Sequence, residues 1–135
     1  MTQILKEAKT KVVHKGERTI KDEKEETAVD YCERLYPETT EEFKKILDEM
    51  YVTFCKKQRN YGPGNISVGT ELKSDDDVKL SLVGLWFRKN DKIQRLKQLV
   101  VLGEPDTVGE SIQDTFQDMS IYGIIAQLVQ QKKFK

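Results

Sequence analysis

Residues 110–129 read ESIQDTFQDMSIYGIIAQLV, and this stretch places carboxylates where a helix buries apolar side chains. At about 100° per residue, Glu110, Asp114 and Asp118 stand above one another on one helix face. The same face continues into three apolar residues, Ile121, Ile125 and Leu128. Because a buried carboxylate needs a cation, a basic side chain or hydrogen-bond donors, we expect these acids to line a site.

A structural interpretation of the same acids remains open. Thr107 and Glu110 have the spacing of a capping box, which predicts a helix that begins just after Thr107. Acids in a first helical turn also complement the helix dipole. These two effects account for Glu110, but Asp114 is less easily explained by them, and Asp118 lies beyond their reach.

The composition is that of one domain with balanced charge. The chain has 135 residues, of which 23 are basic and 23 acidic. Because these charges balance, the net charge does not attract the protein to nucleic acid or to a membrane. The sequence has neither a membrane-span pattern nor a signal-peptide pattern, which predicts a cytoplasmic protein. Cys32, Cys55 and His14 lack zinc-site spacing, so a metal would be a hard ion such as Mg²⁺ held by carboxylates.

The chain in order predicts a mainly α fold, a bundle of three long helices with a shorter one before them. Residues 1–27 carry the charged run KDEKEE and are expected to form an extended N-terminal arm with a short element over residues 4–13. Residues 28–135 would then form the helical domain. Its first helix is expected over residues 28–35, because Pro37 stops it.

Apolar stripes at helical spacing predict the long helices. The first stripe comprises Phe43, Ile46, Leu47, Met50, Tyr51 and Phe54. The second comprises Leu82, Leu85, Trp86, Ile93, Leu96 and Val100. Ser74 and Asp77 mark the start of the second helix. We expect both stripes to enter the core, and we expect the tail QQKKFK to be solvated.

A Gly-rich loop insertion is expected over residues 59–74, between the first two long helices. Its polar residues, Asn60, Tyr61 and Asn65, could present amides and an aromatic ring to a ligand. The loop matches neither the P-loop nor the dinucleotide fingerprint. In the alternative interpretation, its glycines and proline only end a helix and form a turn.

The second long helix carries a basic flank at i, i+3, i+4, i+7 spacing, formed by Arg88, Asp91, Lys92 and Arg95. Arginine forks match phosphate oxygens, so this flank could clamp a phosphate beside a metal-binding acid. It could equally be a salt-bridge ladder on the surface. Spacing alone does not separate these two interpretations.

Three ordered blocks, NYGPGNIS, LWFRKNDKIQRLKQLV and ESIQDTFQDMSIYGIIAQL, resemble a family of bacteriophages and their hosts, the nucleotide modification-associated domain of the first type. The resemblance covers about residues 43–129. The matching positions are Tyr61, Gly62 and Asn65, then Asp91, Lys92, Arg95 and Leu96, then Glu110, Ser111, Asp114, Thr115, Asp118 and Tyr122. Many relatives have an aspartate before the tyrosine, where this chain has Asn60.

The resemblance implies a helical, nucleotide-handling domain. Its acid-rich helices are similar in style to the all-α nucleoside triphosphate pyrophosphatases of the MazG type. That group has an ExxE pair followed by an ExxD pair, whereas Glu110, Asp114 and Asp118 stand at steps of four. The likeness to this second group is therefore one of composition and not of motif.

Two functional hypotheses follow. The first is a magnesium-dependent nucleotide hydrolase or modification-associated enzyme, in which acids hold the ion and the ion activates water. Its catalytic residues would be Asp91, Asp114 and Asp118, and its metal ligands Glu110, Asp114 and Asp118. Its nucleotide-binding residues would be Asn60, Tyr61, Gly62, Asn65, Arg88, Lys92, Arg95 and Tyr122.

The second hypothesis is a non-catalytic binder that sequesters a cyclic or modified nucleotide used in host defence signalling. Such a pocket needs arginines, amides and aromatic rings but no metal. A third interpretation is a structural helix bundle in which the acids and bases form ion pairs. A second apolar arc, Ile112, Phe116 and Met119, lies opposite the first acids, so a homo-oligomer is expected in each case. Direct nucleic-acid and membrane contacts are not expected.

Overall fold

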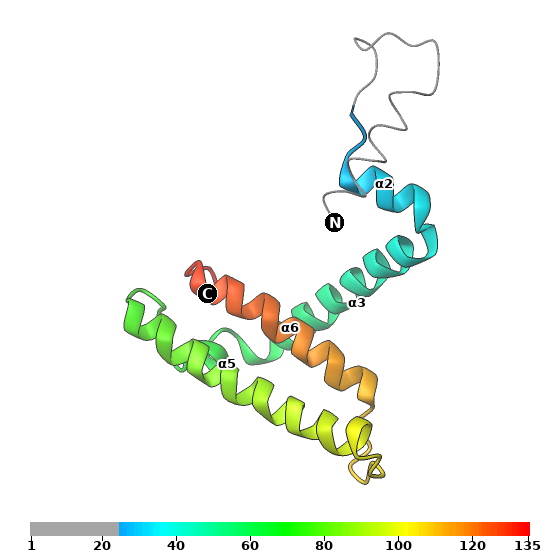
Figure 1. Cartoon of the computed structure of the whole chain (residues 1–135). Coiled ribbons are helices and arrows are strands. Elements are labelled where there is room, and N and C mark those ends of the chain that lie inside the picture. Colours follow the sequence, from blue (N-terminus) through cyan, green and yellow to red (C-terminus); the bar gives the residue numbers. More distant parts are fainter. Residues whose placement is uncertain (1–24) are drawn as a thin grey trace, which may run out of the picture. The chain divides into compact units, whose positions relative to one another are not determined.

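The computed structural model describes residues 25–135, and these residues form helices and no strand, which confirms the mainly α prediction. The order is α2 (Ala28–Leu35), α3 (Pro37–Tyr61), α4 (Gly64–Ser67), α5 (Asp75–Leu96), the π-helical turn η1 (Lys97–Val101) and α6 (Ile112–Gln130) (Figure 1). The element predicted over residues 4–13 lies outside the described residues. None of the helices described is long and apolar enough to cross a membrane.

The chain divides into two compact units, Met1–Ile46 and Leu47–Lys135, and each is described by itself. In the first unit, the hydroxyl of Thr27 caps α2 by accepting a hydrogen bond of 3.1 Å from the backbone N–H of Asp30. The helix ends before Pro37, as predicted. Two ion pairs hold this unit: Arg34 of α2 lies 2.8 Å from Glu26 just before the helix, and Lys44 of α3 lies 2.6 Å from Glu33 of α2.

The start of α5 agrees with its sequence signal. The Ser74 hydroxyl accepts a bond of 3.1 Å from the N–H of Asp77, and the Asp77 carboxylate accepts a bond of 3.4 Å from the N–H of Ser74. The start of α6 differs from the prediction, because its N-cap is Ser111, whose hydroxyl accepts a bond of 3.0 Å from the N–H of Asp114. The capping box at Thr107 is therefore wrong, and Glu110 precedes the helix.

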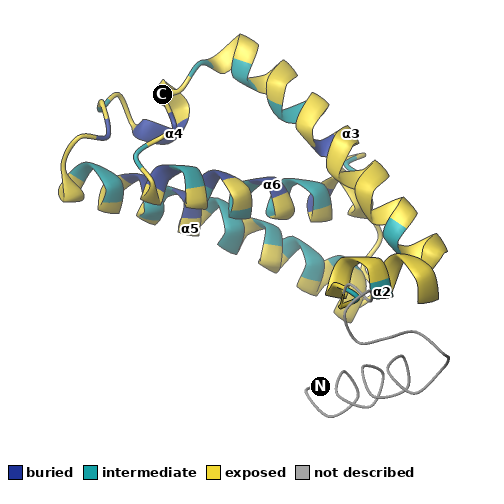
Figure 2. Cartoon of the chain, turned by 90° about the horizontal axis from the view of Figure 1, so that it is seen from above, coloured by how far each residue is buried: buried dark blue, intermediate teal, exposed yellow. Residues whose placement is uncertain are grey.

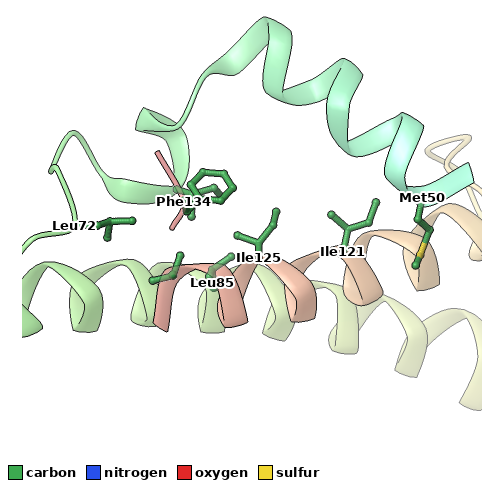
Figure 3. Close-up of a cluster of buried hydrophobic side chains, with 8 residues drawn as sticks. Met50, Leu72, Leu85, Ile121, Ile125 and Phe134 are labelled. Atoms are coloured by element: carbon green, nitrogen blue, oxygen red, sulfur yellow. The ribbon is translucent and has the colours of Figure 1, made fainter. Parts of the chain in front are cut away.

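The core of the second unit lies between the paired helices α5 and α6 and the segments that cover them (Figure 3). Its buried apolar side chains are Met50, Ile66, Leu72, Leu85, Ile121, Ile125, Val129 and Phe134. Phe134 is only 4% exposed, and its ring meets the ring of Phe54 edge to face with centroids 6.3 Å apart. The prediction of a wholly solvated tail is therefore wrong at Phe134.

Much of both predicted apolar stripes is exposed (Figure 2). The exposed members are Phe43, Ile46, Leu47, Tyr51, Trp86, Ile93 and Val100. On α5, the side that faces α6 carries Leu85, and a residue one position along a helix points about 100° away. Within the second unit, Trp86 and the exposed residues in line with it therefore have no further helix packed over them.

The region predicted as one irregular loop is partly helical. Helix α3 continues to Tyr61, and α4 forms a single short turn from Gly64. Gly62 separates the two helices with a φ of 64°, a left-handed conformation that glycine adopts without steric cost. The glycines of this region thus end one helix and redirect the chain toward α5, against which α4 packs.

Candidate functional site

A pocket of about 320 Å³ lies in the second unit, where α3, α4, α5 and α6 all contribute side chains. Its aromatic lining consists of Phe54, Tyr61, Tyr122 and Phe134. Its polar lining consists of Lys57, Gln58, Asn65, Arg88 and Asp118, and its aliphatic floor of Ile66, Ile121 and Ile125. An apolar cavity of this size with a few convergent polar groups is typical of small-molecule sites.

Helix α3 supplies one wall of the pocket from a single face. Phe54, Lys57, Gln58 and Tyr61 follow the spacing i, i+3, i+4, i+7, so they stand above one another over two turns. Tyr61 was predicted as a site residue, whereas Lys57 and Gln58 were not. The helical spacing back from Tyr61 was the signal that could have identified them.

Arg88 of α5 is held at the pocket by contacts from two other helices. Its Nη2 donates a hydrogen bond of 3.0 Å to the backbone carbonyl of Asn65 in α4. Its guanidinium also lies over the ring of Tyr122 in α6, with 5.9 Å from Cζ to the ring centroid. Three predicted nucleotide-binding residues, Asn65, Arg88 and Tyr122, are thus brought together, and Tyr61 lines the same pocket.

Asp118 of α6 lies at the edge of the pocket between two lysines. Its carboxylate is 2.9 Å from Nζ of Lys92 and 3.2 Å from Nζ of Lys57, and its side chain is 16% exposed. Burial alone would raise the pKa of Asp118, but hydrogen bonds from Lys92 and Lys57 outweigh it and lower that pKa below its ordinary value. Asp118 therefore stays ionised at neutral pH.

Lys92 joins Asp118 to the segment that precedes α6. Its Nζ is 2.8 Å from Glu110 as well as 2.9 Å from Asp118. Burial by itself lowers the pKa of Lys92, but the hydrogen bonds to the two carboxylates outweigh it and raise that pKa. One half-buried ammonium group therefore serves both acids.

Arg95 fastens the same segment to α5. It donates to the hydroxyl of Thr115 at 3.2 Å and to the backbone carbonyl of Glu110. Its guanidinium also lies 3.3 Å from the carboxylate of Asp106 and 3.6 Å from that of Glu110. Lys92 and Arg95 thus face acids of their own chain and do not line the pocket.

The remaining predicted site residues lie apart from the pocket. Asp114 is exposed in the first turn of α6, and Asp91 is exposed on α5. Neither carboxylate has an ion pair within residues 25–135. Asn60 is exposed near the end of α3 and is not part of the lining, and Gly62 contributes the turn that follows Tyr61.

The acids do not form the ligand set expected for Mg²⁺. In the part of the chain that the structure describes, no three acidic, cysteine or histidine side chains gather as a potential metal site. Glu110 and Asp118 do approach each other, but the ammonium group of Lys92 lies between them and supplies the positive charge. In this arrangement Lys92 supplies the positive charge that the two carboxylates require.

The arrangement can hold an anionic ligand that carries an aromatic ring. Lys57 and Arg88 provide cationic donors, and Tyr61 and Tyr122 provide aromatic surfaces in the same cavity. Asp118 adds a hydrogen-bond acceptor at its edge. No protein family, curated protein or solved structure that was compared with the chain matches it.

Proposed function

We propose that the protein is a nucleotide-binding protein whose ligand occupies the pocket between α3, α4, α5 and α6. The observation that carries this proposal is the convergence of two cations, Lys57 and Arg88, with two tyrosines, Tyr61 and Tyr122, in one cavity. Phosphate and base recognition require these two kinds of group within one nucleotide's length. The resemblance to the nucleotide modification-associated domain supports the same class of ligand.

The geometry suggests a role for each side chain. Arg88 is fixed by the Asn65 carbonyl and by the Tyr122 ring, so its remaining N–H groups are preorganised for phosphate oxygens. Lys57 adds a second charge from α3. The rings of Tyr61 and Tyr122 offer stacking surfaces for the base. The Asp118 carboxylate would accept hydrogen bonds from a base amine or a ribose hydroxyl.

The charge of the pocket favours a ligand of low charge. Two cations and one ionised carboxylate line it, so a triphosphate would bring more negative charge than the pocket offsets. A cyclic nucleoside monophosphate carries one negative charge and suits this balance. We therefore favour binding and sequestration of a cyclic or modified nucleotide in the host cytoplasm, of the anti-defence type.

Magnesium-dependent hydrolysis is the competing proposal. It requires a divalent ion on the acids of α6, whereas Lys92 holds Glu110 and Asp118, and Asp114 points to solvent. Turnover would therefore require Lys92 to move away from Glu110 and Asp118, so that a divalent ion could bind these acids. The same experiment tests both proposals.

The test incubates purified protein with nucleoside triphosphates and with cyclic nucleotides, in magnesium and in EDTA. The melting temperature and the recovered small molecules are both measured. We expect a cyclic nucleotide to raise the melting temperature in EDTA and to be recovered unchanged. Metal-dependent product would instead support the hydrolase, and the absence of any shift or product would overturn both proposals.

Arg88→Met supplies the site-specific version of this test. A hydrogen bond from a charged donor stabilises a complex by about 1.5–3 kcal/mol. Its loss should therefore lower the affinity by roughly 10- to 150-fold. Arg59→Met is the matched control, because Arg59 is an exposed arginine of α3 outside the pocket lining. Circular dichroism verifies that both variants are folded, and equal affinities of the two variants would refute this assignment of the site.

A further inference from the structure

The outer face of α5 carries several exposed apolar side chains and lies apart from the ligand pocket. Trp86 is 61% exposed there, Val83 and Ile93 are exposed as well, and Val100 is exposed in the η1 turn that follows. A shallow recess of about 490 Å³ occupies the first half of this face. It is lined by Asp75, Val78, Lys79, Leu82, Val83 and Trp86.

The two ends of the same face carry opposite charges. Asp75 and Asp76 are exposed in the first turn of α5, and Lys97 is exposed just after its last residue. The Asp75 side chain is fully exposed, and its carboxylate lies 3.4 Å from the Lys132 ammonium. Within residues 25–135, Lys97 has no ion-pair partner. The acidic and basic ends are separated by about 33 Å of helix, at 1.5 Å per residue.

We propose that two copies of this chain pair through the outer faces of their α5 helices, antiparallel, about a two-fold axis at Trp86. Asp75 and Lys97 lie equally far from Trp86 in the sequence. In that register, each Asp75 faces Lys97 of the second copy at both ends of the interface. Trp86 meets Trp86 of the second copy at the centre.

The recess and the exposed side chains are complementary in this register. Residues 79–86 of one copy oppose residues 86–93 of the other, because the two helices run in opposite directions. Ile93 of the second copy then enters the recess opposite Lys79, whose aliphatic stem can cover it. The exposed Ile93 of each copy thus fills the recess in the first half of α5 of the other copy.

The charge pattern selects a second copy as the occupant and the antiparallel direction. A helix that is acidic at one end, basic at the other and apolar between them is self-complementary when it is reversed. Parallel pairing would place Asp75 against Asp75 and Lys97 against Lys97, which is repulsive at both ends. The face therefore specifies both its partner and its orientation.

Charge reversal in trans tests this interface. Asp75→Lys alone places two lysines together at each end, and Lys97→Glu alone places two acids together there. Each variant should self-associate about tenfold more weakly than the wild type in sedimentation over a concentration series. When the two variants are mixed in equal amounts, both ends become attractive, so the mixture should associate as the wild type does.

Trp86 provides an independent readout, because it is the chain's single tryptophan. Its emission should shift to shorter wavelength as the wild-type concentration rises, and each single variant should show less of this shift at the same concentration. Lys56→Glu is the matched control, since Lys56 is an exposed lysine of α3, and it should leave the association unchanged. Circular dichroism checks that the variants are folded.

Three results would overturn the proposal. The wild type could sediment as a monomer at every concentration, or it could form a dimer that neither charge reversal weakens. The mixed variants could also fail to recover the association that each one lacks. Any of these results would mean that the outer face of α5 does not join two copies in the register at Trp86.

Discussion

The seam between α5 and α6 has two halves that are built from different chemistry. In one half, the buried Leu85 of α5 lies near the buried Ile125 of α6 (Figure 3), and Val129 of α6 belongs to the same buried cluster. In the other half, Lys92 and Arg95 of α5 meet Asp118 and Thr115 of α6 and Glu110 just before it. The same two helices therefore change from apolar packing to ion pairing along one continuous interface.

This difference explains why acids and core residues share a helix face. The face of α6 is continuous, and its partner α5 changes in parallel, from Ser81 and Leu85 to Arg88 and Lys92. Apolar contacts tolerate small shifts because the hydrophobic effect has no direction. Ion pairs need every partner in place, because an unpaired buried charge is costly. The apolar half should therefore contribute most of the free energy of unfolding. The polar half should fix how α5 and α6 are aligned along their length.

Ile125→Ala should have the largest effect, because it removes a buried side chain from the apolar half. We expect a loss of about 2–4 kcal/mol in the free energy of unfolding, from lost burial and from the cavity left behind. Urea denaturation measures it. Ile124→Ala is the control, since Ile124 is its exposed neighbour and should lose less than about 1 kcal/mol. Equal losses would contradict the assigned packing of α6.

Lys92→Met should have an intermediate effect, because it keeps the side-chain length but removes the cation that Glu110 and Asp118 share. A fully buried pair would lose more, but the Lys92 side chain is 20% exposed and water screens part of the charge. We therefore expect a loss of about 1–2 kcal/mol in urea denaturation at neutral pH. Lys56→Met, at an exposed lysine of α3, should stay within about 0.5 kcal/mol of the wild type.

The pH dependence of this loss tests its cause. The folded-state pKa of Asp118 is lowered from an ordinary 3.8, so its contribution is present above pH 3.8 and is lost as the pH falls through the folded value. The pKa of Lys92 is raised from 10.5, so the lysine stays charged over this range. The gap between wild type and Lys92→Met should therefore narrow below pH 3.8. A gap that stays constant in acid would mean that Lys92 acts by packing and not by charge.

Ser81→Ala should have the smallest effect and the opposite sign. The Ser81 hydroxyl is wholly buried in α5, and it has no hydrogen-bond partner among the described residues. Removing an unsatisfied hydroxyl from an apolar environment should raise the free energy of unfolding by about 1 kcal/mol. Ser120→Ala is the comparison, because the exposed Ser120 hydroxyl donates to the Phe116 carbonyl at 3.0 Å. A destabilised Ser81→Ala would indicate that the hydroxyl is satisfied after all.

The sequence predicted the features that depend on neighbouring residues. The helix over residues 28–35, the helix start at Ser74 and the shared face of Asp118 and Ile121 all follow from local spacing and local hydrogen bonds. The start of α6 was misassigned because Thr107 and Ser111 both offer a capping hydroxyl with an acid three residues later. Local rules do not decide between two such signals when packing determines which residue is free to cap.

Features that depend on distant segments were harder to predict. Lys57 was not assigned to the site, because its contact with Asp118 joins residues 61 positions apart in the chain. Phe134 lies in a basic tail and is buried because it packs with Phe54 and the core cluster. The exposed stripe on α5 has the same spacing as a core stripe, so sequence alone does not distinguish burial within the chain from an open face. The family resemblance pointed to Tyr61, Asn65 and Tyr122, and the spacing of the basic flank pointed to Arg88; all four line one pocket.

The position of Asp118 between two lysines has a thermodynamic consequence. Lys57 lines the pocket, whereas Lys92 reaches Glu110 and the segment that leads into α6. An anion that draws Lys57 toward itself removes one of the two lysines that pair with Asp118. Lys92 then pairs more strongly with Asp118, and its ion pair with Glu110 is weakened. Occupancy of the pocket and anchoring of the segment before α6 are thus linked equilibria, and each must change the free energy of the other by the same amount.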